Sequence, residues 1–286
     1  MADHSPAHRE SRRRRGLITG AGSGLGRAIA IQLGRGGWEL ALADIDVKTC
    51  EETAQRVRAI GGLARVELLD ISSLEQWSVL VSRLKNEWPV LDLLVNNAGI
   101  AAEGKIGDFP LADWRQVLNV NLLGTIYGCH FCHDWLVANP DGAHVINVAS
   151  AAAFLCAPGM GAYSVSKAGV ISLSETLYAE LRPLGVGVSV VCPGFFQTNL
   201  LEDAHFQDDQ QRAFAQRLMR DSPISAENVA RAAVRAIRRK QLYVVLPFRA
   251  RALWWLRRLW PTTIMRFVAW AAARKRAIPG ADAQPR

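Results

Sequence analysis

Residues 16–46 read GLITGAGSGLGRAIAIQLGRGGWELALADID, which is an apolar run, a glycine-rich turn, a helix-like segment and a second apolar run. The turn has the spacing T-G-x-x-x-G-x-G, formed by Thr19, Gly20, Gly24 and Gly26. Glycine lets a backbone turn sharply and approach a pyrophosphate, and the first amides of the following helix attract the same anion. Because apolar runs flank the turn, it predicts a dinucleotide site that includes Ser23 and Leu25, rather than a glycine turn without a ligand.

Asp44 closes the second apolar run, twenty residues after Gly24. At the end of a strand its carboxylate can accept hydrogen bonds from the ribose hydroxyls of adenosine, and it would repel a 2′-phosphate. No arginine lies next to it in the sequence, and Ser23 takes the place of a basic residue in the turn. The sequence therefore favours NAD over NADP, although an Asp that only caps a turn would occupy the same position.

Three further apolar runs end in polar residues, in ARVELLDIS, LDLLVNNAG and AHVINVAS. Each is typical of a buried parallel strand, and such runs alternate with helix-like segments over residues 16–247. In open α/β sheets the carboxyl ends of the strands border the ligand. We therefore expect one domain over residues 14–247, and its ligand edge would include Asp70, Asn97, Ala98, Gly99 and Ser150.

Tyr163 and Lys167 lie four residues apart in GAYSVSKAG, and Ser150 lies thirteen residues upstream of the tyrosine. On a helix, residues at this spacing share a face. A fixed positive charge favours the phenolate, so we expect the lysine to lower the tyrosine pKa from its ordinary value of about 10. The phenol could then exchange a proton with a substrate oxygen held by the Ser150 hydroxyl. The spacing alone is weak evidence, because most such pairs lie on protein surfaces.

The interpretation of the whole chain depends on a set of short motifs that occur in a fixed order. They are TGAGSGLG, Asp70 with Ile71, NNAG, NVNLLG, Ser150, YSVSK and PGFFQT. In this order and at these spacings, the chain resembles the short-chain dehydrogenase/reductase family over about residues 14–247. The resemblance implies an α/β fold, namely a Rossmann-like, doubly wound parallel sheet of about seven strands with helices on both faces.

The resemblance also implies catalytic roles. Tyr163 would be the general acid/base, Lys167 would lower the pKa of Tyr163 and bind the nicotinamide ribose, and Ser150 would hydrogen-bond the substrate oxygen. Asn121 would support a proton relay through Lys167. We choose Asn121 over Asn119 because the family's asparagine lies three residues before a glycine, as Asn121 does here.

Cofactor contacts beyond the glycine turn and Asp44 are implied in the same way. The strand-end residues that would contact the adenine or line the cofactor are Asp70, Ile71, Asn97, Ala98 and Gly99. The segment that would hold the nicotinamide end contains Pro193, Gly194 and Thr198.

These residues predict an NAD(P)-dependent oxidoreductase that interconverts a secondary alcohol and a ketone, or a primary alcohol and an aldehyde. Residues 195–225 would form a substrate lid, and their apolar side chains indicate a lipophilic substrate, although ordinary helix packing would explain them equally well. The alternative is a dinucleotide-binding regulator or scaffold, which the complete Asn, Ser, Tyr and Lys set disfavours. The resemblance also implies a homo-oligomer, as a dimer or tetramer.

Residues 129–133 read CHFCH, the pattern of c-type haem attachment and a candidate metal site. We expect neither, because the segment continues a helix in the middle of the predicted fold and no secretion signal precedes it. The five cysteines are scattered, as in a reducing cytoplasmic compartment.

The net charge of +8 is divided unevenly along the 286 residues. Residues 16–228 contain 15 basic and 23 acidic residues, whereas residues 229–286 contain 14 basic residues and one acidic residue. A uniformly basic nucleic-acid-binding domain would not have this distribution, so we expect no nucleic-acid partner. Residues 1–13 are expected to be a disordered basic tail, and the arginines at positions 12–15 are expected to be solvated, with a phosphate or membrane contact as the alternative.

Residues 248–286 form a basic, Trp-rich extension beyond the predicted domain. On a helix, Leu253, Trp255 and Leu259 would share a broad apolar face, and the arginines would share the other face with Trp254. This composition predicts an amphipathic helix lying on a membrane surface through residues 248–277, with packing on the domain or on a second subunit as the alternative. No apolar run reaches the ~18 residues that a membrane span requires.

Overall fold

The computed structural model describes residues 12–196, 205–206, 213, 216–217, 219–222 and 224–276. Seven strands form one sheet in the order β3-β2-β1-β4-β6-β7-β9, and all neighbouring strands in it are parallel. The strands of this sheet are β1 (Arg15–Thr19), β2 (Glu39–Asp44), β3 (Leu63–Leu68), β4 (Leu93–Asn96), β6 (His144–Val148), β7 (Gly187–Pro193) and β9 (Tyr243–Leu246). The predicted Rossmann-like parallel sheet is confirmed.

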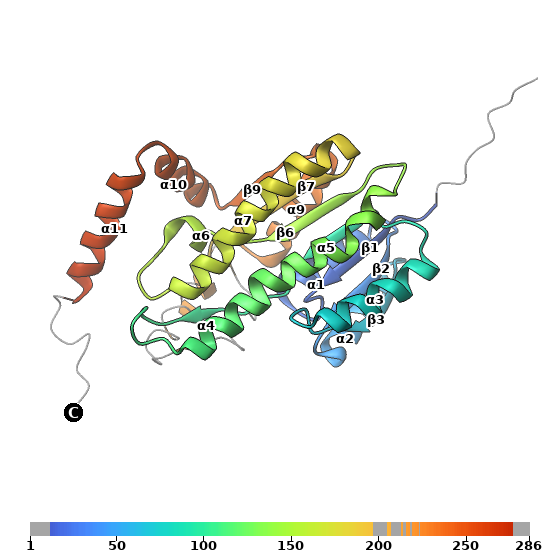
Figure 1. Ribbon diagram of the computed structural model, residues 1–286, viewed down its shortest axis with the longest axis horizontal. Coiled ribbons are helices and arrows are strands. Elements are labelled where there is room, and N and C mark those ends of the chain that lie inside the picture. The colour runs from blue at the N-terminus through green and yellow to red at the C-terminus, as the bar shows by residue number, and fades with distance from the viewer. Residues whose placement is uncertain are drawn as a thin grey trace, which may run out of the picture.

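Helices cover both faces of the sheet (Figure 1). One face is covered by α1 (Gly24–Gly34), α2 (Val47–Ala59) and α9 (Ala226–Arg239), and the other by α3 (Leu74–Glu87), α5 (Gly124–Val137) and α7 (Gly161–Leu181). Successive residues of a strand point to opposite faces, so Ile18 packs in the first core and Leu17 in the second. The strands are therefore buried on both sides, which explains why their sequences are continuously apolar.

A π-helical turn connects two helices beside the sheet. α4 (Leu111–Leu118) continues into η1 (Asn119–Leu123), which leads into α5. Turns of this kind are rare and often lie at functional sites. In this turn Asn121 is fully buried, whereas Asn119 is exposed. The remaining short elements are α6 (Ala152–Leu155), a 3₁₀ turn η2 (Arg182–Leu184), and the paired strands β5 (Ala102–Glu103) and β8 (His205–Phe206).

The C-terminal extension consists of two helices. α10 (Phe248–Leu259) contacts β9 and α6, and α11 (Pro261–Arg276) follows after Trp260 and contacts α10. In Figure 1 both helices lie beyond the β9 end of the sheet, and α11 stands away from the sheet. Among the helices of the described residues, none has both the length and the apolar character needed to span a bilayer.

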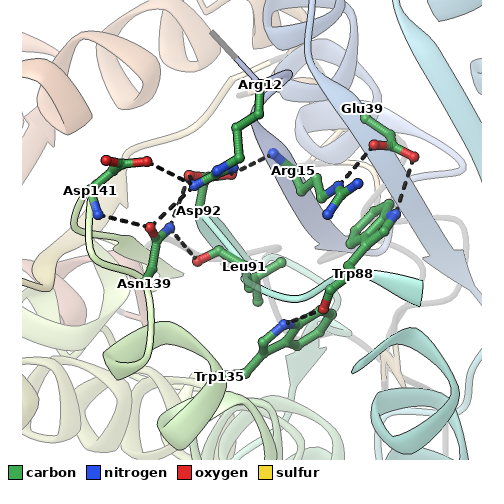
Figure 2. Close-up of polar contacts among 9 residues, drawn as sticks. All are labelled: Arg12, Arg15, Glu39, Trp88, Leu91, Asp92, Trp135, Asn139 and Asp141. Carbon is green, nitrogen blue, oxygen red and sulfur yellow. Dashed lines mark hydrogen bonds and ion pairs between the residues drawn. The ribbon is translucent and has the colours of Figure 1, made fainter. Parts of the chain in front are cut away.

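Asp92 organises a polar network at the amino edge of the sheet (Figure 2). Arg12 donates two hydrogen bonds to its carboxylate, at 2.6 and 2.7 Å, and the backbone N–H of Arg15 donates a third at 2.7 Å. Asn139 donates to the same carboxylate at 2.9 Å and to the carbonyl oxygen of Leu91 at 3.1 Å. Burial favours a higher pKa for Asp92, but the hydrogen bonds from Arg12, Arg15 and Asn139 outweigh it, so the pKa of Asp92 is lowered.

A second set of contacts joins the same edge. The Arg15 side chain pairs with Glu39 at 3.0 Å, and Glu39 accepts a hydrogen bond from the Trp88 indole at 3.1 Å. The prediction that the arginines at positions 12–15 are merely solvated is therefore wrong for Arg12 and Arg15. Both are held by carboxylates that lie far away in the sequence, which no local pattern could show.

Candidate active site

A cleft of about 670 Å³ opens at the carboxyl edge of the sheet. This volume lies within the range of small-molecule sites. Its lining includes most of the residues predicted to bind the cofactor, which are Gly20, Ser23, Gly24, Leu25, Asp44, Asp70, Ile71, Asn97, Ala98, Gly99, Tyr163, Lys167 and Pro193. The parallel topology brings them together, because the carboxyl ends of all strands meet at one edge.

The glycine turn has the geometry that a pyrophosphate requires. Gly20 and Gly24 have φ values of +63° and +50°, a conformation that favours glycine. Gly26 allows α1 to approach β1, because a Cβ at this position would lie 2.0 Å from the carbonyl oxygen of Gly20. Ser23 precedes α1 without giving it a side-chain hydrogen bond, so its hydroxyl does not satisfy the first amides of the helix. The residues present therefore fit a bound phosphate group.

Thr19 and Asn97 fix the turn against the neighbouring strand. The Asn97 side-chain amide donates to the carbonyl oxygens of Thr19 and Gly20, at 3.0 Å each. In return, the Thr19 hydroxyl accepts hydrogen bonds from the backbone N–H groups of Asn97 at 3.0 Å and Ala98 at 3.2 Å. The shape of the turn thus depends on the NNAG segment as well as on its own glycines.

Asp44 lies at the end of β2 with its carboxylate against the glycine turn. It accepts hydrogen bonds from the backbone N–H of Gly22 at 2.7 Å and of Asp46 at 3.1 Å. These contacts hold the carboxylate at the rim of the cleft, where it could still accept a hydrogen bond from a ribose hydroxyl.

Tyr163 is buried on α7, and its hydroxyl is hydrogen-bonded with Ser150. Burial raises the pKa of Tyr163 to about 12, although the hydrogen bond from Ser150 acts in the opposite direction. The prediction that the Tyr163 pKa is lowered is therefore wrong. Burial disfavours the phenolate more strongly than the neighbouring groups favour it.

Lys167 is buried one helical turn after Tyr163. Its Nζ donates to the carbonyl oxygen of Val148 at 2.9 Å and lies 5.9 Å from the centroid of the Tyr163 ring. Burial lowers the pKa of Lys167 to about 8. With this pKa Lys167 is still mostly protonated near neutral pH, and the Tyr163 pKa is raised nevertheless because burial of the phenol dominates.

Asn121 lies beneath the cleft and holds the segment after NNAG. Its side-chain oxygen accepts from the backbone N–H of Ile100 at 2.8 Å, and its amide donates to the Ile100 carbonyl oxygen at 2.9 Å and to the Ser166 hydroxyl at 3.2 Å. Gly99 lies directly over this group, since a Cβ there would lie 2.9 Å from the Asn121 oxygen and 3.3 Å from Lys167 Nζ. The choice of Asn121 over Asn119 stays a prediction, because Asn119 itself lines the cleft.

Several other predicted residues do not line the cleft directly. Gly26 packs on Gly20, Ser150 contacts Tyr163, and the backbone N–H of Gly194 donates to the carbonyl oxygen of Leu246 at 2.7 Å. Thr198 and most of the expected lid over residues 195–225 lie outside the described residues.

α4 contributes a wall that the sequence analysis missed. The cleft is also lined by Ala112, Arg115 and Gln116 of α4, where Arg115 and Gln116 follow Ala112 by three and four residues on one side of the helix. Asn119, already considered as the alternative to Asn121, continues this side at the start of η1. Extending the helical period upstream from the NVNLLG motif would have found the three residues of α4. Further unpredicted lining residues are Ile45, Leu69, Ser72, Ile100, Val120, Val148 and Ala149. Phe196, which belongs to the predicted lid, also lines the cleft.

The CHFCH segment forms part of α5. Cys129 and Cys132 are buried in the core between α5 and the sheet, and burial raises the pKa of both thiols, to about 12 for Cys129. His133 is half-buried on α5 and pairs with Asp134 at 2.7 Å. Within the described residues, no three metal-ligating side chains lie close enough to hold a metal ion.

Comparisons with known proteins agree with this geometry. A family model described as short chain dehydrogenase matches residues 15–209. The protein named "Probable oxidoreductase EphD" from Mycobacterium tuberculosis is 35% identical over 255 residues, which cover 86% of this chain and 43% of that protein. The chain therefore spans less than half the length of this relative.

Solved structures show the same fold. A short chain dehydrogenase/reductase from Burkholderia phymatum in complex with NAD has a TM-score of 0.77 and 31% identity, covering 82% of this chain and 88% of that chain. An alcohol dehydrogenase from Thermococcus sibiricus complexed with 5-hydroxy-NADP has a TM-score of 0.70 and 23% identity, covering 82% and 96%. At 23% identity, the similarity to the Thermococcus sibiricus structure shows a shared fold and nothing more.

Proposed function

Since the chain belongs to the short-chain dehydrogenase family, we propose that it is an NAD-dependent oxidoreductase that interconverts an alcohol and the corresponding ketone or aldehyde. One observation supports this more than any other. A cleft with a pyrophosphate-type glycine turn at one end has a buried Tyr163 and Lys167 pair on its wall. Proton exchange and dinucleotide binding are the two requirements of this reaction.

NAD would supply a hydride acceptor on its nicotinamide ring. The glycine turn and the first amides of α1 would hold its pyrophosphate, and the Asp44 carboxylate would hold the adenosine ribose. Arg27 is the basic residue beside this turn, but it donates to the Thr53 hydroxyl at 2.9 Å and to the Thr49 carbonyl oxygen at 3.2 Å. Because Arg27 is committed to these groups and Asp44 is anionic, the site favours NAD over NADP.

Tyr163 would exchange the proton at its phenolic oxygen, and Ser150 would hold the substrate oxygen beside it. With its raised pKa, Tyr163 is a phenol near neutral pH, which suits donation of a proton to a carbonyl oxygen. The reverse direction requires the phenolate, which the charged form of Lys167 would favour. Asn121 would act as a positioning residue, since it orients Ile100 and the backbone above Lys167.

The substrate is proposed to be lipophilic. The cleft lining that includes Tyr163 also contains Val148, Ala149, Ile100 and the buried Phe196. Such a wall gives apolar contacts to a substrate and few polar groups that would need a partner.

Hydride transfer measured across a panel of lipophilic alcohols, with NAD and with NADP, tests this proposal. The wild-type protein is expected to reduce NAD with at least one alcohol, and Tyr163→Phe to abolish turnover while NAD binding stays nearly unchanged. Tyr178→Phe provides a matched control, because Tyr178 lies on the same helix but outside the cleft lining. Unchanged turnover in Tyr163→Phe would refute the assignment, and NAD binding without any turnover would favour the regulatory alternative.

A further inference from the structure

α10 turns its arginine-bearing side toward the body of the protein. Trp254 is 9% exposed and packs on Tyr243, with ring centroids 4.9 Å apart. Arg258 lies on the same side, where its guanidinium carbon is 4.3 Å from the centroid of the Trp254 ring and its Nη2 donates to the Tyr243 hydroxyl at 3.1 Å. An amphipathic helix that only covered the domain would bury its apolar face instead.

The outward side of α10 carries large apolar side chains. Phe248, Trp255 and Leu259 recur at positions i, i+7 and i+11 and are 78%, 53% and 64% exposed. Leu256 lies beside this line and is also exposed. Single exposed apolar residues are ordinary, but a contiguous row marks an interaction surface.

α11 adds a second exposed apolar group. Phe267 and Trp270 are 62% and 49% exposed, and their ring centroids are 5.6 Å apart. The guanidinium carbon of Arg274 lies 4.0 Å from the centroid of the Trp270 ring. α11 stands away from the sheet, so these side chains are not covered by the domain (Figure 1).

The charges around these side chains have one sign. Residues 248–276 contain eight Lys and Arg residues and no Asp or Glu. Arg249, Arg266 and Arg274 are exposed. Residues 14–247 contain 22 basic and 23 acidic residues and are therefore nearly neutral, so an anionic surface would attract α10 and α11 far more strongly than the domain.

From the outward apolar row and its cationic surroundings, we propose that α10 and α11 bind the surface of an anionic lipid bilayer. The exposed Trp, Phe and Leu side chains enter the boundary between headgroups and acyl chains, and the exposed arginines pair with the lipid phosphates. Because the domain is nearly neutral and residues 248–276 carry eight basic residues and no acidic residue, the attraction orients the molecule with its C-terminal helices toward the bilayer.

Other occupants fit these helices less well. A symmetric contact with a second copy would place two cationic surfaces against each other, because residues 248–276 contain no acidic residue to pair with the arginines. A nucleic acid backbone would pair with the exposed arginines, but it would leave the apolar row of Phe248, Trp255 and Leu259 in water.

The position of α10 connects this surface with the cleft. α10 contacts α6, which follows Ser150, and Arg257 Nη2 donates to the Cys156 sulfur, just beyond α6, at 3.7 Å. A bilayer bound to α10 would therefore lie on the same side of the molecule as α6, which follows the Ser150 proposed to hold the substrate oxygen. This last step rests on the proposed function, whereas lipid binding itself does not.

Co-sedimentation of the full chain with vesicles, without substrate or cofactor, tests the proposal. The wild-type protein is expected to pellet with phosphatidylcholine–phosphatidylglycerol vesicles and much less with phosphatidylcholine alone, and salt should weaken the binding. Trp255→Glu combined with Leu259→Glu should weaken binding by about tenfold or more, since it removes two apolar anchors and adds two negative charges.

A matched control places two glutamates on α3. Leu74→Glu combined with Val79→Glu also replaces exposed apolar residues, and it should pellet like the wild type. Far-UV circular dichroism and NAD binding verify that both variants are folded. The proposal is overturned if the wild type does not pellet, if the α10 variant pellets equally well, or if the α3 control is equally impaired. It is also overturned if the α10 variant dissociates an oligomer, which would identify a protein–protein surface.

Discussion

The Nζ of Lys167 lies 5.9 Å from the centroid of the Tyr163 ring, and both side chains are buried. Two ionisable groups are thus held together where neither charge is well solvated. Burial raises the pKa of Tyr163 to about 12 and lowers that of Lys167 to about 8. The arrangement costs stability, which is characteristic of groups retained for function.

Lys167→Met is expected to abolish turnover without lowering the free energy of unfolding at pH 7. The lowered pKa corresponds to about 3 kcal/mol of disfavoured charge, whereas the lost bond to the Val148 carbonyl oxygen is worth about 1 kcal/mol. Denaturant unfolding of both proteins measures the difference. A Met variant that is clearly less stable at pH 7 would contradict the argument.

The pH dependence of stability distinguishes the same two proteins. Between about pH 8 and about pH 10, unfolded Lys167 binds a proton that folded Lys167 has released, so the wild-type free energy of unfolding rises with pH. Tyr163 opposes this rise only above about pH 10, where the unfolded tyrosine loses its proton first. Lys167→Met should lack the rise, and an identical slope in both proteins would show that Lys167 is not buried as described.

Asp44→Asn is expected to lower the preference for NAD over NADP. The Asn side-chain oxygen can still accept from the Gly22 N–H, but it no longer repels a 2′-phosphate. We expect the ratio of kcat/KM for the two cofactors to shift toward NADP by about tenfold. Asp46→Asn is the matched control, because Asp46 caps α2 and does not line the cleft. If the ratio of kcat/KM for the two cofactors is unchanged in Asp44→Asn, Asp44 does not determine the cofactor preference.

The sequence was sufficient for the dinucleotide half of the fold because its signals are local. The strand, glycine turn and helix that contain Gly20, Gly24 and Gly26 lie within a few residues of one another. Buried parallel strands are also continuously apolar, so their order along the chain and the residues at their carboxyl ends follow directly.

The pKa shifts in the site and the orientation of α10 could not be predicted from the sequence, because both depend on burial in the folded protein. The direction of the Tyr163 pKa shift depends on how deeply its ring is covered, and the same surroundings lower the pKa of Lys167. Helical periodicity divided α10 into two faces, but it could not tell which face meets the domain. The arginine side does so, because Glu175 and Tyr243 offer it partners.

Arg12→Gln is expected to lower the free energy of unfolding at pH 7 by about 1–3 kcal/mol, since it leaves the buried Asp92 carboxylate with fewer partners. Because the pKa of Asp92 is lowered in the folded protein, this stabilisation is present above the unfolded pKa of about 3.9 and is lost as pH falls. The two proteins should therefore converge in acid. Arg13→Gln, at the exposed neighbouring position, should match the wild type throughout, and equal losses in both variants would count against a specific role of Arg12.

His144 gives a separate test of the amino edge of the sheet. It is buried, its Nε2 lies 2.8 Å from the Ser189 hydroxyl, and burial, assisted by Lys240, lowers its pKa to about 4. Between about pH 6.5 and about pH 4, the unfolded histidine binds a proton that the folded one does not, so stability falls as pH falls, by up to about 3 kcal/mol. His144→Gln should flatten this part of the curve, whereas His133→Gln, at a half-buried site, should keep it. If His144→Gln retained the full slope, another group would be responsible for the loss of stability in this range.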